Sequence, residues 1–164
     1  MSPFTASMIL LLKNLLFMVI VPGAAAVYLP LYIAREWSAA SGGGFFSALV
    51  LFTAGGAMYV WCMWDFAVFG RGTPAPIDPP KKLVVRGLYR YTRNPMYLSV
   101  MTVILGWAVL YQAEVLGLYA LALGLIFHLF ILFYEEPHLR GVFGKEYEDY
   151  CAAVGRWVPK LPRR

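Results

Sequence analysis

Four stretches of the sequence carry no formal charge and are long enough to cross a lipid bilayer. They lie at 14–34, 45–64, 96–113 and 115–134 and consist mainly of apolar and small residues. A helix needs about 20 residues to cross the hydrocarbon core, within a range of roughly 17–25. The runs are continuous and do not alternate, which favours helices over a β-barrel. The pattern predicts an all-α integral membrane protein, a single domain over 1–164 with four transmembrane helices.

The charged residues gather in two segments, and their distribution predicts how the helices are oriented. The connection 65–95 and the tail 135–164 carry six each of the fourteen Lys and Arg residues, whereas the loop 35–44 carries one and the turn 112–114 none. Cytoplasmic loops collect Lys and Arg. We therefore expect the connection, the tail and both termini in the cytoplasm. The shortness of the chain points to a bacterial inner membrane.

The overall composition agrees with a membrane protein and argues against several other classes. Hydrophobic residues make up 60% of the chain, charged residues 14%, and the mean hydropathy is +0.64, whereas soluble domains contain about 25% charged residues. The net charge of +5 suits attraction to anionic membrane lipids, and no nucleic-acid-binding motif accompanies it. Cys62 and Cys151 lie in an apolar run and in the tail, so no disulfide is expected. The sequence has no metal-ligand spacing, Walker loop or dinucleotide-binding motif.

Proline and glycine residues predict where the helices bend, approach one another and begin. Pro22, Gly23 and Pro30 are expected to bend the first helix, and the pair Gly55-Gly56 lets a neighbouring helix come close. The prolines within 74–80 favour an extended connection, and Gly87 permits a tight turn. The pair Asn94-Pro95 is a typical helix start, with Asn as the N-cap and Pro at the first helical position.

The tail contains a helical pattern of its own. Its apolar residues recur at intervals of three or four, at Leu139, Val142, Phe143, Tyr147, Tyr150, Cys151, Val154 and Trp157. This periodicity predicts an amphipathic helix on the membrane surface or over the cytoplasmic face, interrupted at Gly141 and Gly144. Arg156 and Trp157 are expected to anchor the tail among the lipid headgroups.

Several residues at the cytoplasmic ends of the apolar runs could carry chemistry. Glu135 and Glu136 are adjacent carboxylates that either pair with arginines, Arg93 or Arg140, or bind a ligand. They face the Asn94 turn if both helices reach the same depth. His128, inside the fourth run, is either a functional group or a hydrogen-bonded packing residue. The nearby tyrosines form either an interfacial belt or a box around a cationic or aromatic ligand; they are Tyr89, Tyr91 and Tyr97.

Two separated segments carry a family resemblance. LVVRGLYRYTRNPMY and EEPHLRGVFGKEYEDYCAAVGRWVP, with a helical hairpin between them, resemble the isoprenylcysteine carboxyl methyltransferase and phospholipid methyltransferase superfamily over about 74–160. The resemblance implies a bacterial-type membrane methyltransferase whose cofactor-binding half binds S-adenosylmethionine at the cytoplasmic face. It implies that Glu135, with Glu136 beside it, holds the amino group of the cofactor. It also implies that the cofactor groove is lined by Lys81, Lys82, Leu83, Val84 and Tyr89 and underlain by Asn94, Pro95, Met96 and Tyr97.

The sequence departs from the family at two positions. The commonest His of the turn is Asn94 here, which keeps a hydrogen-bonding side chain, and Ile131 stands where prenylcysteine enzymes have an Arg thought to hold the substrate carboxylate. His128 lies one turn earlier and is the candidate catalytic residue. The expected reaction is methyl transfer to a lipophilic acceptor, with the tail as a lid. The alternatives are N-methylation of a phospholipid or small amine, a non-catalytic membrane binding module, and a nicotinamide-dependent membrane reductase.

Overall fold

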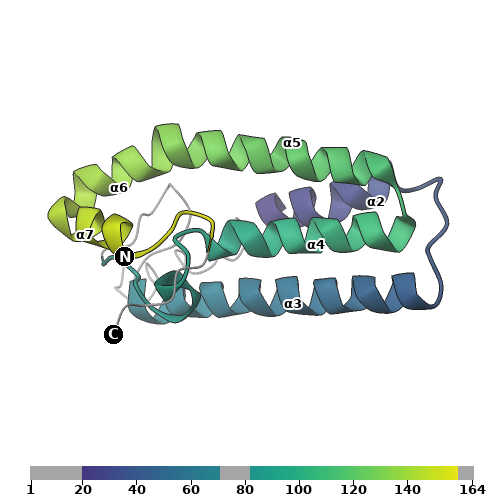
Figure 1. The fold of residues 1–164 in the computed structure, drawn as a ribbon, viewed down its shortest axis with the longest axis horizontal. Coiled ribbons are helices and arrows are strands. Elements are labelled where there is room, and N and C mark those ends of the chain that lie inside the picture. Colours follow the sequence, from purple (N-terminus) through teal and green to yellow (C-terminus); the bar gives the residue numbers. More distant parts are fainter. Residues whose placement is uncertain (1–19, 71–81, 159–164) are drawn as a thin grey trace, which may run out of the picture.

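The computed structural model describes residues 20–70 and 82–158, and within these ranges the chain is helical with no β-strand (Figure 1). Its long helices are α3 (Gly43–Asp65), α4 (Pro95–Tyr111) and α5 (Glu114–Phe130). The shorter helices are α2 (Leu29–Ile33), α6 (Glu136–Phe143) and α7 (Lys145–Ala153). Single turns of π or 3₁₀ geometry complete the order: η1 (Ala24–Tyr28), η2 (Phe66–Gly70), η3 (Gly87–Arg90) and η4 (Ile131–Glu135).

Two helices in the described part of the chain are long and apolar enough to cross a membrane, fewer than the four expected. They are Gly43–Asp65, of 23 residues, and the continuous helix Glu114–Phe143, of 30 residues. The third expected span is the shorter apolar helix Pro95–Tyr111, and the first is described only as Ile20–Ile33. Residues 14–19 of the first run, the prolines of 74–80 and Lys81 lie outside the described residues.

Helices α3 and α4 pack side by side because small residues remove the side chains between them (Figure 1). A Cβ on Gly55 of α3 would lie 2.9 Å from the Ser99 carbonyl oxygen and 2.7 Å from a methyl of Val103 on α4. Only glycine fits there, so the expected close approach is confirmed at Gly55. Gly56 has nothing near its Cβ position in the described structure and plays no such part.

The first helix loses its regular α geometry at the π turn η1, close to Pro22, Gly23 and Pro30, where a bend was expected. Pro30 has no backbone N–H, so the Ala26 carbonyl four residues earlier lacks its helical donor. The π turn η1 covers this point, and the Trp107 indole of α4 donates to the Ala26 carbonyl at 2.7 Å. The missing main-chain bond is thus replaced by a side chain of the neighbouring helix.

A similar adjustment carries the fourth helix past Pro137 and beyond the apolar run, which ends at Tyr134. The π turn η4, Ile131–Glu135, precedes Pro137, which occupies one of the first positions of α6. An extra residue in the turn accommodates the proline, because its ring and its missing N–H cannot continue a regular α-helix. The helix therefore continues to Phe143, and both Glu135 and Glu136 lie on it.

The tail folds back over one end of the helices. Gly144, with φ +52°, ends α6 and starts α7, so the predicted interruption is confirmed there, while Gly141 lies inside α6. The buried residues Tyr147, Tyr150 and Val154 pack against Leu83 of the connection, together with Leu139, Phe143 and Cys151. Figure 1 shows α6, α7 and the start of α4 at one end of the bundle and the short α4–α5 turn at the other.

Candidate functional site

The turn that starts α4 is joined to the last described residues of the tail. The main-chain N–H of Arg93 donates to the Gly155 carbonyl at 2.9 Å, beside a single parallel bridge between Thr92 and Gly155. The carbonyl of Arg156 accepts from the Thr92 hydroxyl and from the Asn94 amide, each at 3.0 Å. The tail is therefore attached to this turn by backbone and side-chain bonds.

Asn94 begins the helix as expected but by a different bond. Helix α4 starts at Pro95 with Asn94 as its N-cap residue, yet the side chain of Asn94 makes no capping hydrogen bond. It is buried and donates across the chain to Arg156 instead. The start of the helix was thus predicted correctly, whereas the partner of the side chain, 62 residues away, was not.

Glu136 is the centre of a group of ion pairs. Its side chain is 3% exposed and receives two hydrogen bonds from Arg156, at 2.7 and 2.9 Å. Arg93 lies 3.1 Å from one carboxylate oxygen, and Arg140 lies 3.6 Å from the other. Burial alone would raise the pKa of Glu136, but the hydrogen bonds and charges of these arginines hold it below its ordinary value. Glu136 therefore links α6 to the start of α4 and to the tail.

Glu135, the adjacent carboxylate, has a different environment. Its partner is the Tyr97 hydroxyl of α4, which donates to Oε2 at 2.7 Å. Burial raises the pKa of Glu135; the Tyr97 hydrogen bond opposes this, and the neighbouring charge of Glu136 adds to it. Among the described residues no cation pairs with Glu135. Two adjacent carboxylates whose pKa values move in opposite directions are suited to different roles.

An aromatic group lies next to Glu135 on the side of the apolar run. The rings of Tyr97 and Phe127 are 4.8 Å apart, and the indole N–H of Trp157 donates to Nδ1 of His128 at 3.0 Å. A neutral His128 that accepts at Nδ1 carries its proton on Nε2. His128 can therefore donate a hydrogen bond from Nε2 but has no free acceptor nitrogen.

The segment expected to line a cofactor groove packs against the end of α3. Val84 and Tyr89 are buried with Cys62, and Phe66, Leu88 and Met96 lie against them. The Tyr150 hydroxyl of α7 donates to the Tyr89 carbonyl at 2.7 Å. Burial raises the pKa of Tyr89 well above its ordinary value, and the neighbouring Cys62 and Glu135 add to the effect. Leu83 packs beneath the tail and Lys82 is exposed, whereas Lys81 lies outside the described residues.

The predicted site residues are thus brought to one end of the bundle, with two differences. His128 lies farther into the apolar run and bonds to Trp157 of the tail, and Lys82 is exposed. Arg156 donates to Glu136 and Trp157 donates to His128; their expected role as headgroup anchors stays a prediction. Sequence analysis gave no role to Asp65, a buried carboxylate at the end of α3. The sequence signal that could have identified Asp65 was its position, since it is a charged residue directly after an apolar run.

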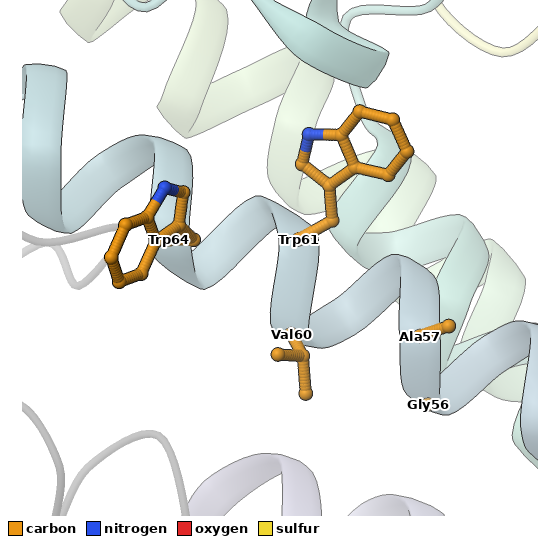
Figure 2. Close-up of a pocket in the computed structure, with 5 residues that line it drawn as sticks. All are labelled: Gly56, Ala57, Val60, Trp61 and Trp64. Atoms are coloured by element: carbon orange, nitrogen blue, oxygen red, sulfur yellow. The ribbon is translucent and has the colours of Figure 1, made fainter.

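A shallow apolar groove of about 590 Å³ lies elsewhere, on α3, and is shown in Figure 2. It is lined by Gly56, Ala57, Val60, Trp61 and Trp64. None of the predicted site residues lines it, and Val60 and Trp64 are largely exposed. We take the convergence of polar groups at Glu135, not this groove, as the candidate site. The described residues hold no cluster of three His, Cys, Asp or Glu side chains that could bind a metal.

Comparison with known proteins identifies the family of the chain. The model of one family, the phospholipid methyltransferases, matches residues 44–146, from the start of α3 to the start of α7. Searches of curated proteins and of solved structures gave no match. The matched range contains the Asn94 turn, His128 and both glutamates, and it covers more than half of the chain. The chain therefore belongs to the phospholipid methyltransferase family and is an S-adenosylmethionine-dependent methyltransferase.

Proposed function

We propose that this protein is an integral membrane enzyme that transfers a methyl group from S-adenosylmethionine to a lipophilic acceptor at the cytoplasmic face. Four transmembrane helices are part of the proposal. It is supported by the two longest apolar helices, Gly43–Asp65 and Glu114–Phe143. Only 17% of the most apolar 18-residue stretch of each helix is buried, so most of its surface is available to lipid. The basic connection and tail would then lie on the cytoplasmic side, with the bilayer being the inner membrane of a bacterium.

The observation that carries the proposal is the contrast between the two glutamates. Glu136 is compensated by three arginines, whereas Glu135 has a tyrosine hydroxyl and no cation in the described structure. A partly buried carboxylate without a counter-charge is unfavourable unless a cation joins it. The ammonium group of S-adenosylmethionine is such a cation. The residues present therefore fit this cofactor, with Glu135 as the ammonium ligand and Tyr97 orienting it.

The remaining residues of the site have supporting roles in the proposal. Bound S-adenosylmethionine would supply a methyl group already activated on a sulfonium. At the start of α4, Pro95 has no N–H and the N–H of Asn94 donates to the Thr92 hydroxyl. The backbone N–H groups of Met96 and Tyr97 favour a negative group such as the cofactor carboxylate. Leu83, Val84 and Tyr89 would border the cofactor, with Lys81 and Lys82 at its edge. Glu136 stabilises the turn and the tail without touching the cofactor.

The acceptor would occupy the aromatic side of the site. Tyr97, Phe127 and Trp157 provide apolar surface for a lipophilic molecule that arrives from the membrane. His128 would donate from Nε2 to a polar group of the acceptor and so align it with the methyl donor. It acts in this scheme by orientation, because its Nδ1 already accepts from Trp157.

N-methylation of an amine lipid is the second candidate, and Ile131 favours it. This side chain is 1% exposed and lies one turn before Glu135, where prenylcysteine enzymes of the resembled superfamily have an arginine. Without that cation a prenylcysteine carboxylate lacks its counter-charge. A lipid amine needs no cation there, although it must lose a proton before it is methylated.

The proposal is tested by measuring S-adenosylmethionine binding to the purified full-length protein in detergent. We expect Glu135→Gln to weaken binding about tenfold or more, because a hydrogen bond between charged groups contributes about 1.5–3 kcal/mol. Glu148→Gln, the same change at an exposed position of α7, should bind as the wild type does. Equal binding by all three proteins would refute the assignment of Glu135. Absence of wild-type binding at millimolar cofactor would favour a non-catalytic module or a nicotinamide-dependent reductase.

The acceptor is identified in a second experiment. Membrane lipid extracts are incubated with the enzyme and a methyl-labelled cofactor, and the labelled product is analysed. Label that is released by mild base indicates a methyl ester, and label that is stable to base on a nitrogen indicates amine methylation. Transfer of label into water-soluble molecules alone would contradict a lipophilic acceptor.

A further inference from the structure

Arg86 is an exposed cation that an aromatic ring holds in place. The carbon of its guanidinium lies 3.9 Å from the ring centroid of Phe69, in the turn η2 that continues α3. None of the ion pairs among the described residues includes Arg86. The ring covers one face of the planar guanidinium, whereas the N–H groups lie along its edge. That edge can therefore still donate to an anion, and a phosphate is a group that fits it.

The apolar groove on α3 ends next to this arginine. Trp61 and Trp64 line the end of the groove that is nearer to Phe69, because η2 follows α3 without a break. Gly87, the residue after Arg86, lies against the same part of α3, since a Cβ there would be 2.7 Å from Nε1 of Trp61. The groove and the guanidinium are thus neighbouring features of one surface.

Small residues keep the other end of the groove open. A Cβ on Gly56 would meet nothing within 4 Å in the described structure, and Ala57 is exposed. Figure 2 shows Val60 and Trp61 projecting on different sides of α3, with Gly56 and Ala57 farther along the helix. From Gly56 to Trp64 the groove follows the helix for about 12 Å, at 1.5 Å per residue. An elongated apolar chain matches this shape.

We propose that this surface binds one anionic membrane phospholipid, with an acyl chain in the groove and the phosphate at Arg86. The inference rests on the membrane placement in the proposed function, which puts the end of α3 at the cytoplasmic headgroups. Tryptophan is enriched at that depth, where Trp61 and Trp64 would lie. Arg90, exposed at the other end of η3, adds positive charge that favours an anionic headgroup. None of the residues proposed to bind the cofactor lines the groove, so this lipid is distinct from the methyl acceptor.

The test titrates the full-length protein in detergent with two lipids and measures the bound fraction by native mass spectrometry. The probes are phosphatidylglycerol and a diacylglycerol with the same two chains, which lacks the phosphate. We expect the wild type to prefer phosphatidylglycerol at least about fivefold, the factor that one cation near an anionic lipid contributes. Arg86→Gln should lower this preference about fivefold. Arg35→Gln is the matched control and should keep the preference, because Arg35 also lies over a ring, that of Tyr32, but pairs with Glu36.

A second variant tests the groove itself. Gly56→Leu places a side chain in the groove and should weaken both lipids about threefold, so that their ratio does not change. The factor is small because lipid chains are as apolar as the groove, and only packing is lost. Gly117→Leu in α5 is the matched control, since a Cβ on Gly117 also meets nothing within 4 Å in the described structure. This control should bind both lipids as the wild type does.

Equal binding of the two lipids by the wild type overturns the inference, and this comparison does not depend on the folding of a variant. The inference is also overturned if Arg86→Gln keeps the wild-type preference or if Arg35→Gln loses as much of it. A dimer that Gly56→Leu dissociates would show that a second copy of the chain fills the groove. A lower Tm of Gly56→Leu with unchanged lipid binding would show that another segment of the same chain fills it. Either result overturns the inference, whereas a lipid preference without any S-adenosylmethionine binding contradicts only the proposed methyl transfer.

Discussion

Glutamine substitutions at the two adjacent glutamates should affect stability differently, because only Glu136→Gln should lower it. Glu136→Gln removes a carboxylate that is 3% exposed and compensates three arginines. Arg140 is half exposed and contributes little, since exposed ion pairs are worth about 0–1 kcal/mol. Arg93 is 10% exposed, and its charge would remain buried without a counter-charge. Breaking a buried pair in this way costs about 3–5 kcal/mol, and we take about 3 kcal/mol because glutamine keeps one acceptor.

Glu135→Gln should instead leave stability unchanged or increase it. The raised pKa of Glu135 means that folding disfavours its charged form, because burial is the largest cause of the shift. At neutral pH a neutral glutamine removes this unfavourable contribution while it can still accept the Tyr97 hydrogen bond. The same substitution, Glu135→Gln, should weaken cofactor binding, as argued above. A site that lowers stability for the sake of binding is common among enzymes.

The assay is thermal unfolding of the detergent-solubilised protein without cofactor, followed by far-UV circular dichroism. For a chain of this size 1 kcal/mol changes Tm by about 2–4 °C, so Glu136→Gln should lower Tm by roughly 6–12 °C. Glu148→Gln, on the exposed surface of α7, is the matched control and should melt with the wild type. The reasoning is refuted if Glu136→Gln melts within a degree of the control, or if Glu135→Gln is destabilised as strongly as Glu136→Gln.

Two further predictions concern protonation and the acceptor side. The pKa of Glu136 is depressed in the folded state, so its stabilising contribution is complete above its ordinary pKa of 4.5 and is lost as the pH falls through the folded value. The Tm difference between the wild type and Glu136→Gln should therefore narrow below about pH 4.5. A Tm difference that does not change with pH would contradict this. His128→Ala should lower turnover of the lipid acceptor roughly tenfold without changing cofactor affinity. Trp157→Phe, which removes the donor to Nδ1 of His128, should lower turnover less. Unchanged turnover in His128→Ala would show that His128 is not part of the site.

Local features of the fold could be predicted from the sequence because their causes are local. The start of α4 at Pro95 follows from the Asn94-Pro95 pair, and the break at Gly144 follows from a glycine that adopts a positive φ. The close approach at Gly55 needed only a small residue in an apolar run. The continuation of the fourth helix through Pro137 was not predicted, because the compensating π turn is not visible in the residue pattern.

The partners of the site residues could not be predicted, since they come from distant parts of the chain. The sequence left two interpretations of the glutamate pair open, arginine pairing or ligand binding. Glu136 makes the arginine pairs, and the ligand-binding interpretation is proposed for Glu135. Nothing in adjacent positions distinguishes two identical residues. What separates them is the direction in which the helix presents each side chain, toward Arg156 of the tail or toward Tyr97 of α4.

The arrangement of Glu136 also explains why Glu135 stays without a cation. Arg93, Arg140 and Arg156 all lie within ion-pair distance of Glu136, and the two glutamates are adjacent on one helix. Arg156 makes the strongest of these contacts, because it donates one hydrogen bond to each carboxylate oxygen of Glu136. This bidentate pair fixes the orientation of the guanidinium, which cannot bind Glu135 in the same way at the same time. Glu136 thus holds the arginines away from its neighbour.

In Glu136→Gln a released arginine would be attracted to Glu135 and would compete with the ammonium group of the cofactor. We therefore expect this variant to bind S-adenosylmethionine more weakly as well, and the affinity should recover at high salt, which screens the competing charge. An affinity loss that salt does not change would mean that Glu136 itself touches the cofactor.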